Sequence, residues 1–233
     1  MSHLVAIHQP NFLPWEGFFD KLVKSNTFII LDDVQYPKSG GWTNRSKFMI
    51  NNEPKWITIP VSKNYSGLKK INEITISSST NWRDQILRRI EENYRNHDHF
   101  KENQSFLESN LDSSETNLAN LNYTLIQALV SELDLKIGTV VFSSTINHVG
   151  SASERLCSLT KQVNGTDYYC GGGSLSYLNK NIFEQEGINI QYQTFKQKPY
   201  RQSKATNFIP GLSIIDALMN LGKEAVRERL LKT

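Results

Sequence analysis

Cysteine is scarce in this sequence, which has only Cys157 and Cys170 in 233 residues. Two cysteines cannot build a disulfide framework, and no Cys-x-x-Cys pair is present to suggest a redox or zinc motif. Chains that do without disulfides are typical of reducing compartments, so we expect a cytoplasmic protein.

Long hydrophobic runs are also missing. No stretch approaches the roughly 18 consecutive apolar residues that a membrane-spanning helix needs. The first ten residues hold no basic segment followed by a long apolar one, so we expect no signal peptide. The sequence therefore predicts a soluble chain with no membrane span.

Neither sign of charge dominates. The 26 Lys and Arg residues face 23 Asp and Glu residues, a formal net charge of +3, and the two signs are mixed along the chain. This balance does not indicate a nucleic-acid-binding surface, although it leaves room for local basic sites that hold an anionic ligand. The hydrophobic share of 38% is ordinary for a globular protein, and a chain of this length can bury a core without metals or disulfides.

The chain opens with a strand–helix–strand pattern. Residues 4–7 and 27–31 are continuous apolar runs, and between them Phe18, Phe19 and Leu22 recur at helical spacing. Continuous apolar strands are typical of a parallel sheet that is covered on both faces. We therefore expect an α/β fold with a mostly parallel sheet and helices on both faces, in a Rossmann-like arrangement.

The rest of the chain continues the alternation around a helical insertion. Further strands are predicted at residues 48–50 and 55–61 (a hairpin), 71–77 (an exposed edge strand), 139–142, 167–170 and 188–195. Further helices are predicted at residues 81–94, 105–111, 118–133, 151–163, 182–186, 213–219 and 223–231. Repeats and linkers are absent, so we expect one domain over residues 1–233, with the helical insertion at about 81–135.

Polar residues directly follow the first two predicted strands. His8 follows the first strand, and Asp32 and Asp33 follow the second. Ligands of parallel α/β sheets bind outside the carboxyl ends of the strands, so we predict that these three residues are catalytic. Paired carboxylates can bind a divalent metal, accept a ribose hydroxyl or act as a general base, whereas the structural alternative is a turn in which an aspartate caps backbone amides. The neighbouring polar residues Gln9, Asn11 and Gln35 are predicted to bind substrate.

The loop that follows the second strand combines cations with an indole. Lys38, Arg45 and Lys47 lie close in sequence to Trp42. Such a set suits a phosphate or carboxylate attached to a flat ring or a sugar face, and the alternative is a solvated loop. We predict that Lys38, Trp42 and Arg45 bind substrate and that Trp15 or Trp42 stacks on a ring.

A glycine run follows the strand predicted at 167–170. Backbone amides of Gly171, Gly172, Gly173 and Ser174 could approach an anion, although neither a Walker loop nor a dinucleotide fingerprint is present. Cys170 has no histidine that can be assigned as its partner, so inert filling is favoured over a nucleophile. The histidines support no metal site, and no cofactor is identified, although the paired aspartates would accommodate a divalent metal.

Residues 6–19 read Ala-Ile-His-Gln-Pro-Asn-Phe-Leu-Pro-Trp-Glu-Gly-Phe-Phe, which resembles the opening signature of the WbqC-like protein family. The resemblance continues through residues 31–35, Lys38, residues 42–45, 59–61 and 208–218. One departure is Cys170, where the family pattern leads us to expect serine, and this argues against a cysteine nucleophile.

The resemblance implies a role in making O-antigen, lipopolysaccharide and other surface polysaccharides, because genes of the family often accompany such clusters. Some of these polysaccharides contain aminoacylated amino sugars. We therefore expect an acyl- or aminoacyltransferase that modifies the amine of a nucleotide-linked amino sugar. Its partners would be the nucleotide sugar and an acyl donor linked to a carrier protein, coenzyme A or tRNA; no other nucleic acid is expected.

Two alternatives stay open. The first is a non-catalytic protein that binds a nucleotide sugar or carbohydrate, because Trp15 and Trp42 suit stacking without catalysis. The second is a nucleotidyl-transferring or adenylate-forming enzyme, since the strand–Gly17–helix–strand order is similar to the nucleotidylyltransferase superfamily. The His-x-Gly-His element of that superfamily is replaced here by Trp-Glu-Gly-Phe at residues 15–18, so the likeness extends to architecture alone.

Overall fold

A five-stranded parallel sheet forms the centre of the computed structural model, which describes residues 2–37, 41–63, 67–111, 114–171, 178–202 and 207–232. The strands are β1 (Leu4–His8), β2 (Thr27–Ile30), β5 (Thr139–Phe142), β6 (Asp167–Cys170) and β7 (Asn189–Tyr192). They lie in the order β5-β2-β1-β6-β7, and each neighbouring pair is parallel. The order reverses between β1 and β6, as in dinucleotide-binding folds. The predicted Rossmann-like α/β architecture is confirmed.

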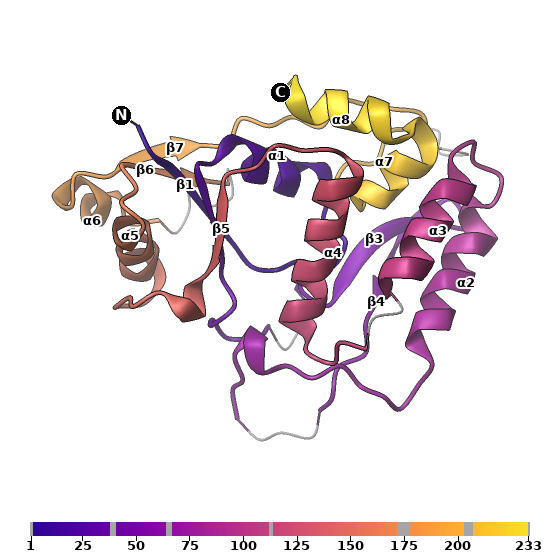
Figure 1. Ribbon diagram of the computed structural model, residues 1–233, viewed down its shortest axis with the longest axis horizontal. Helices are drawn as coiled ribbons and strands as arrows, with labels where there is room; N and C mark the ends of the chain where they lie inside the picture. The colour runs from indigo at the N-terminus through magenta and orange to yellow at the C-terminus, as the bar shows by residue number, and fades with distance from the viewer. Residues whose placement is uncertain are drawn as a thin grey trace.

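Helices cover both faces of the sheet. Figure 1 shows α5 (Ala152–Gln162) and α6 (Lys180–Gln185) on one side of the strands and α1 (Glu16–Lys24) on the other. Successive residues of a strand point to opposite faces. Accordingly, Ala6 joins the core that contains α1, whereas Val5 and Ile7 join a second cluster with α5 and α6. His8 follows the same alternation and therefore faces α1.

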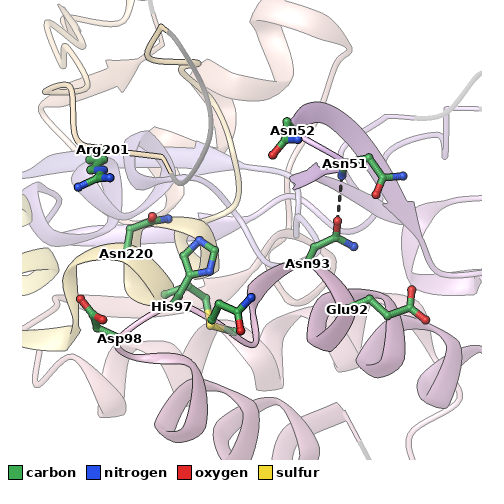
Figure 2. A pocket seen from close by; sticks show the side chains of 10 residues that line it. Asn51, Asn52, Glu92, Asn93, His97, Asp98, Arg201 and Asn220 are labelled. Carbon is green, nitrogen blue, oxygen red and sulfur yellow. Dashed lines mark hydrogen bonds between the residues drawn. The ribbon is translucent and has the colours of Figure 1, made fainter.

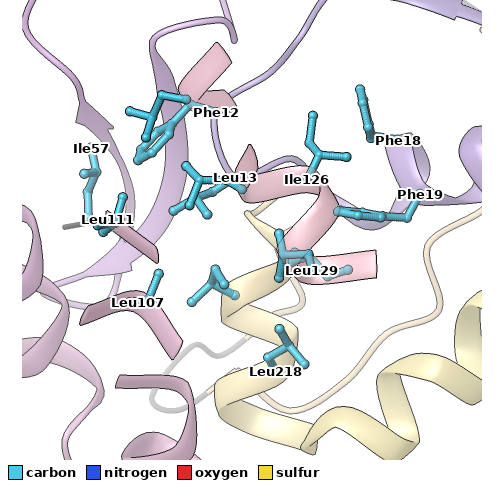
Figure 3. Packing of buried hydrophobic residues seen from close by; sticks show 14 of the residues in the cluster. Phe12, Leu13, Phe18, Phe19, Ile57, Leu107, Leu111, Ile126, Leu129 and Leu218 are labelled. Carbon is cyan, nitrogen blue, oxygen red and sulfur yellow. The ribbon is translucent and has the colours of Figure 1, made fainter. Parts of the chain in front are cut away.

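The segment between β2 and β5 holds the insertion. It contains the antiparallel hairpin β3 (Arg45–Ile50) and β4 (Glu53–Thr58), the short 3-10 helix η1 (Ile71–Glu73), and helices α2 (Trp82–Tyr94), α3 (Phe100–Leu111) and α4 (Leu118–Glu132). After β5 comes the 3-10 helix η2 (Ser143–Thr145), and the chain ends with α7 (Ile214–Leu221) and α8 (Lys223–Leu231). Figure 3 shows Phe12 and Leu13 packed among side chains of these helices, including Ile126, Leu129 and Leu218. In the described part of the chain, every helix is too short or too polar to cross a membrane.

Residues 71–77 were predicted as an edge strand and instead form η1 and isolated bridges. The amide of Ile71 donates to the carbonyl of Val34, and that of Ile76 donates to Thr116. Because these bonds go to different parts of the chain, no continuous ladder can form. The alternating isoleucines are buried by packing against the insertion rather than by membership of a sheet.

The loop between β1 and α1 crosses the interior and is tied to distant segments. The side-chain amide of the fully buried Asn122 in α4 donates to the carbonyls of Pro10 at 2.9 Å and Thr43 at 2.6 Å. The hydroxyls of Ser46 and Ser213 each donate to the carbonyl of Leu13 at 2.9 Å. These hydrogen bonds give the carbonyls of a buried irregular segment their donors. Without donors, burying those carbonyls would cost free energy.

Side chains from α1, from the residue before it and from distant segments cover the first turn of α1. A β-carbon added to Gly17 would lie 2.3 Å from the indole of Trp15, so only glycine fits beneath that ring. The buried carboxylate of Glu16 pairs with Arg229 at 2.8 Å and accepts a hydrogen bond from Gln197. The start of α1, where dinucleotide-binding folds hold a pyrophosphate, is thus occupied by protein.

Candidate functional site

A cavity of about 960 Å³ lies at the carboxyl ends of the central strands, and we call it the switch-point cavity. It is lined by Ile7, His8, Gln9, Asn11, Lys21, Leu31, Val34, Gln35, Pro37, Gly41, Trp42, Ser151, Ala152, Arg155, Leu156, Tyr168 and Gly171. These residues come from the ends of β1, β2 and β6, from α1, from the loop that follows β2, and from the start of α5. The position matches the general ligand site of open α/β sheets, where the strand order reverses. The volume suits a small-molecule ligand.

The structure brings together six of the residues predicted from sequence. His8, Gln9, Asn11, Gln35, Trp42 and Gly171 all line the switch-point cavity. Four others, Trp15, Asp32, Asp33 and Arg45, are absent from its lining. Lys38, Gly172, Gly173 and Ser174 lie outside the described residues.

His8 closes β1 and is held by its immediate surroundings. Its Nδ1 lies 2.9 Å from the carbonyl oxygen of Gln9, and its ring meets Phe18 edge-on at 5.1 Å. A carbonyl oxygen can only accept, so Nδ1 carries the proton and Nε2 keeps its lone pair. Burial and the nearby charge of Lys21 lower the pKa of His8 from 6.5 to about 4. The imidazole is therefore uncharged at neutral pH.

Lys21 is a buried cation of the same cavity. It lies on α1, its side chain is 5% exposed, and its Nζ donates one long hydrogen bond of 3.4 Å to the carbonyl of Ile7. Burial lowers its pKa from 10.5 to about 8, although the nearby Cys170 and Asp20 act in the opposite direction. Among the described residues no carboxylate lies within 4.0 Å of Nζ. The ammonium group is thus poorly compensated.

Asp32 acts as a structural anchor between β2 and η2. Its Oδ1 accepts from the amide of Ser144 at 3.0 Å, and its Oδ2 accepts from the hydroxyl of Ser144 at 2.7 Å. The side-chain amide of Asn72 donates to Oδ2 of Asp32 at 3.2 Å. These bonds cap the start of a short helix, which is the structural alternative that the sequence left open.

Asp33 shares Ser143 with Asp32 and links it to two further side chains. Its carboxylate accepts from the hydroxyl of Ser143 at 2.5 Å and lies 2.7 Å from Nε2 of His148 and 4.0 Å from Nη1 of Arg155. Burial alone would raise the pKa of Asp33, but the hydrogen bonds from Ser143 and His148 and the electrostatic attraction of His148 and Arg155 outweigh it, so the pKa is lowered. The carboxylate sits between the hydroxyl and the imidazole, which is not the order of a serine hydrolase triad.

Trp42 brings an aromatic wall to the cavity, while Arg45 is engaged elsewhere. The Trp42 ring packs edge-on against Trp56 at 4.9 Å. The guanidinium of Arg45 lies 4.2 Å above the Trp56 ring, and Nζ of Lys47 lies 5.1 Å from the same ring. Nζ of Lys47 also lies 5.6 Å from the Trp42 ring, so the hairpin cations contact both indoles, while Trp42 also lines the cavity.

The chain matches the WbqC-like protein family model over residues 9–228. The chain belongs to the WbqC-like protein family. It is also 34% identical over 224 residues, 95% of each chain, to the uncharacterized protein Rv1507c of Mycobacterium tuberculosis. No solved structure matches it significantly. In this WbqC-like chain the opening signature thus forms the buried loop and one wall of the switch-point cavity.

Sequence reasoning missed three polar residues of this region. Lys21 and Arg155 line the cavity, and His148 pairs with Asp33 next to it. Lys21 did carry a signal, because it lies three residues after Phe18 and so falls on the apolar face of α1. His148 and Arg155 follow β5, more than 110 residues after Asp33, so only the sheet order brings them to the aspartate.

A second cavity of about 550 Å³ lies between the hairpin turn, the end of α2 and α7, and we call it the polar cavity. Figure 2 shows His97 near its centre, with Asn220 and Arg201 on one side and Asn93 on the other. His97 Nδ1 contacts the carbonyl of Tyr94 at 3.0 Å. Most of the lining side chains are exposed, although Nε2 of His97 is buried and has no hydrogen-bond partner among the described residues. The described residues contain no cluster of three or more metal-ligating side chains.

Proposed function

We propose that the protein transfers an acyl or aminoacyl group to the amine of a nucleotide-linked amino sugar in surface-polysaccharide biosynthesis. The reaction takes place in the switch-point cavity. The observation that carries the proposal is the uncharged imidazole of His8, with an unused Nε2, in a cavity where parallel sheets bind nucleotides. Membership of the WbqC-like family supports the substrate class.

His8 acts as the general base. The sugar amine attacks the acyl carbonyl, so that a C–N bond forms and the carbonyl oxygen gains the negative charge. Nε2 of His8 takes the proton that the nitrogen loses. The intermediate then collapses, the bond to the donor's sulfur or oxygen breaks, and the protonated His8 returns the proton to that leaving group. An uncharged imidazole is ready for this cycle at neutral pH.

The other residues of the cavity bind and orient. Trp42 stacks on the base or the sugar face, and the amide side chains of Gln9, Asn11 and Gln35 hydrogen-bond to hydroxyls. The orientation of His8 comes from the Gln9 carbonyl and from Phe18. Asp33 is a positioning residue, because it holds Arg155 at the edge of the cavity and does not line the cavity itself.

The test combines purified protein with amino-sugar nucleotides and with thioester or ester acyl donors, and detects acylated sugar by mass. We expect product with the wild type and a loss of about 100-fold or more with His8→Gln. His99→Gln is the matched control, because His99 pairs with Glu102 outside the cavity. Full activity of His8→Gln would remove His8 from the mechanism. Tight binding of the nucleotide sugar with no turnover across the donor panel would favour the non-catalytic binding protein instead.

A further inference from the structure

We propose that Lys21 and Arg155 form a phosphate-binding pair in the switch-point cavity and that they hold the diphosphate of the nucleotide sugar. The inference rests on the proposed function for the identity of the ligand, and on the geometry for the site itself. The sequence suggested Lys38 and Arg45 for this task. Arg45 stacks on Trp56, and Lys38 lies outside the described residues.

Lys21 supplies the first half of the argument. A buried ammonium group normally has a counter-ion and several acceptors, because leaving it without them costs free energy. Among the described residues, Nζ of Lys21 makes one hydrogen bond, the long one to the carbonyl of Ile7. Asp20, the neighbouring acid on α1, already pairs with Lys24 at 2.6 Å and accepts from Tyr169 and Gln193. The ammonium group therefore needs an anion from the cavity that it lines.

Arg155 supplies the second half. Its Nη1 is 4.0 Å from Asp33, and its Nε is buried without a hydrogen-bond partner in the part of the chain that the structure describes. The guanidinium thus has donors to spare, and it presents a planar set of donors that suits phosphate oxygens. Asp33 holds the side chain in place without using up its donors. Two cations from opposite sides of the sheet, α1 and α5, therefore line one cavity.

The starts of both helices are engaged by protein groups, so the side chains must supply the site. Ser151 and Ala152, at the start of α5, line the cavity beside Arg155. The amino end of a helix attracts anions, but the carboxylate of Glu154 already accepts a hydrogen bond from the amide of Ser151 there. Trp15 and Glu16 occupy the first turn of α1 in the same way. The anion is therefore held by the side chains of Lys21 on α1 and Arg155 on α5.

Phosphate binding at Lys21 would also act on His8. The charge of Lys21 disfavours protonation of the imidazole in the empty cavity. A phosphate next to Lys21 neutralises that charge, so His8 becomes a stronger base when substrate is bound. The other ionisable groups that act on Lys21 are Asp20 on α1 and Cys170 on β6, and Asp20 is already paired with Lys24. Lys21 is then the group through which the bound phosphate acts on His8.

The test uses inorganic pyrophosphate as the probe and isothermal titration calorimetry at pH 7. We expect wild-type binding to weaken at least tenfold in Lys21→Met and in Arg155→Gln. Lys136→Met and Arg95→Gln remove the same charges from exposed positions outside the cavity and should leave binding unchanged. The pKa of His8, followed by NMR, should rise when pyrophosphate binds to the wild type and should not respond to pyrophosphate in Lys21→Met.

Equal loss of affinity in the control variants would show that net charge alone attracts the probe, which would overturn the proposal. Malonate that binds as tightly as pyrophosphate, with the same dependence on Lys21, would overturn the assignment to phosphate. Thermal unfolding confirms that each variant is folded. Pyrophosphate binding requires no turnover, so the phosphate site can be confirmed even if no acyl transfer is found. Conversely, if Lys21→Met binds pyrophosphate normally, the phosphate site is overturned even where acyl transfer is observed.

Discussion

The indole of Trp15 lies directly over Gly17, where a side chain would fall 2.3 Å from the ring atoms. The ring also packs edge-on against Phe195 at 5.7 Å. Trp15 therefore covers the start of α1 and is absent from the lining of the switch-point cavity. This contact explains why a glycine interrupts the opening turn of a helix, where it would otherwise be unfavourable.

Gly17→Ala should destabilise the protein by roughly 1–2 kcal/mol, because the overpacking cost exceeds the gain in helix propensity. In a Trp15→Ala background the same substitution should be neutral or stabilising, because the clashing ring is gone. Urea unfolding of the four proteins measures the coupling. Equal effects of Gly17→Ala in both backgrounds would show that the indole does not cause the requirement for glycine.

Lys21→Met should stabilise the ligand-free protein at pH 7. The pKa of Lys21 is lowered to about 8 in the folded state, so protonation favours unfolding at every pH below the ordinary value of 10.5. The penalty is fully present below about pH 8 and disappears as pH rises from 8 through 10.5. It amounts to at most about 3 kcal/mol at 1.36 kcal/mol per pKa unit. Urea unfolding at pH 7 and pH 10 should show that the advantage of Lys21→Met shrinks with rising pH; a constant difference would contradict it.

Asp33→Asn should lower stability at neutral pH by about 1–3 kcal/mol, because the buried Ser143 and the partly buried His148 and Arg155 lose a charged acceptor. The pKa of Asp33 is lowered on folding, so its contribution is present above the unfolded value near 3.8 and is lost as pH falls through the folded value. The difference between wild type and variant should therefore narrow below pH 4. Asp98→Asn, at an exposed position, is the control and should show no such pH dependence.

Asn122→Leu should destabilise the protein by about 2–4 kcal/mol, because the carbonyls of Pro10 and Thr43 would be left buried without donors. Asn122→Asp should destabilise the protein more than Asn122→Leu does, because it keeps the shape of the side chain and places carboxylate oxygens against those carbonyls. Both variants can be compared by thermal unfolding. If Asn122→Asp proved as stable as the wild type, the two hydrogen bonds would not be what holds the loop.

Strand ends were the part of the site that the sequence could predict. His8, Gln9 and Asn11 follow an apolar run, and a parallel sheet places such residues at one edge. The same reasoning placed Asp32 and Asp33 at the correct strand end, but it could not choose the direction of their side chains. That direction depends on Ser143 and Ser144, which arrive from β5 about 110 residues later.

The helices and strands also divide into those that the sequence predicts and those that it does not. The helices and parallel strands have strong apolar periodicity, and the structure contains them close to the predicted residues. Residues 71–77 alternate like a strand because Ile74 and Ile76 are buried, yet the hydrogen bonds of this segment go to separate partners. An alternation of apolar and polar residues indicates which side chains are buried, but burial alone does not specify the hydrogen-bond ladder of a β-sheet. Lys21 was overlooked for a related reason, because a lysine in a helix is ordinarily a solvated residue.

The carbonyl of Leu13 accepts hydrogen bonds from Ser46 and from Ser213, which is 200 residues further along the chain. A contact of such sequence separation forms late, because the intervening chain must be ordered before its ends can meet. We therefore expect the loop between β1 and α1 to reach its final shape only when α7, which begins directly after Ser213, packs against it. On the ribosome, a nascent chain that still lacks its last 20 residues or so would hold the strands of the sheet but not a finished binding site.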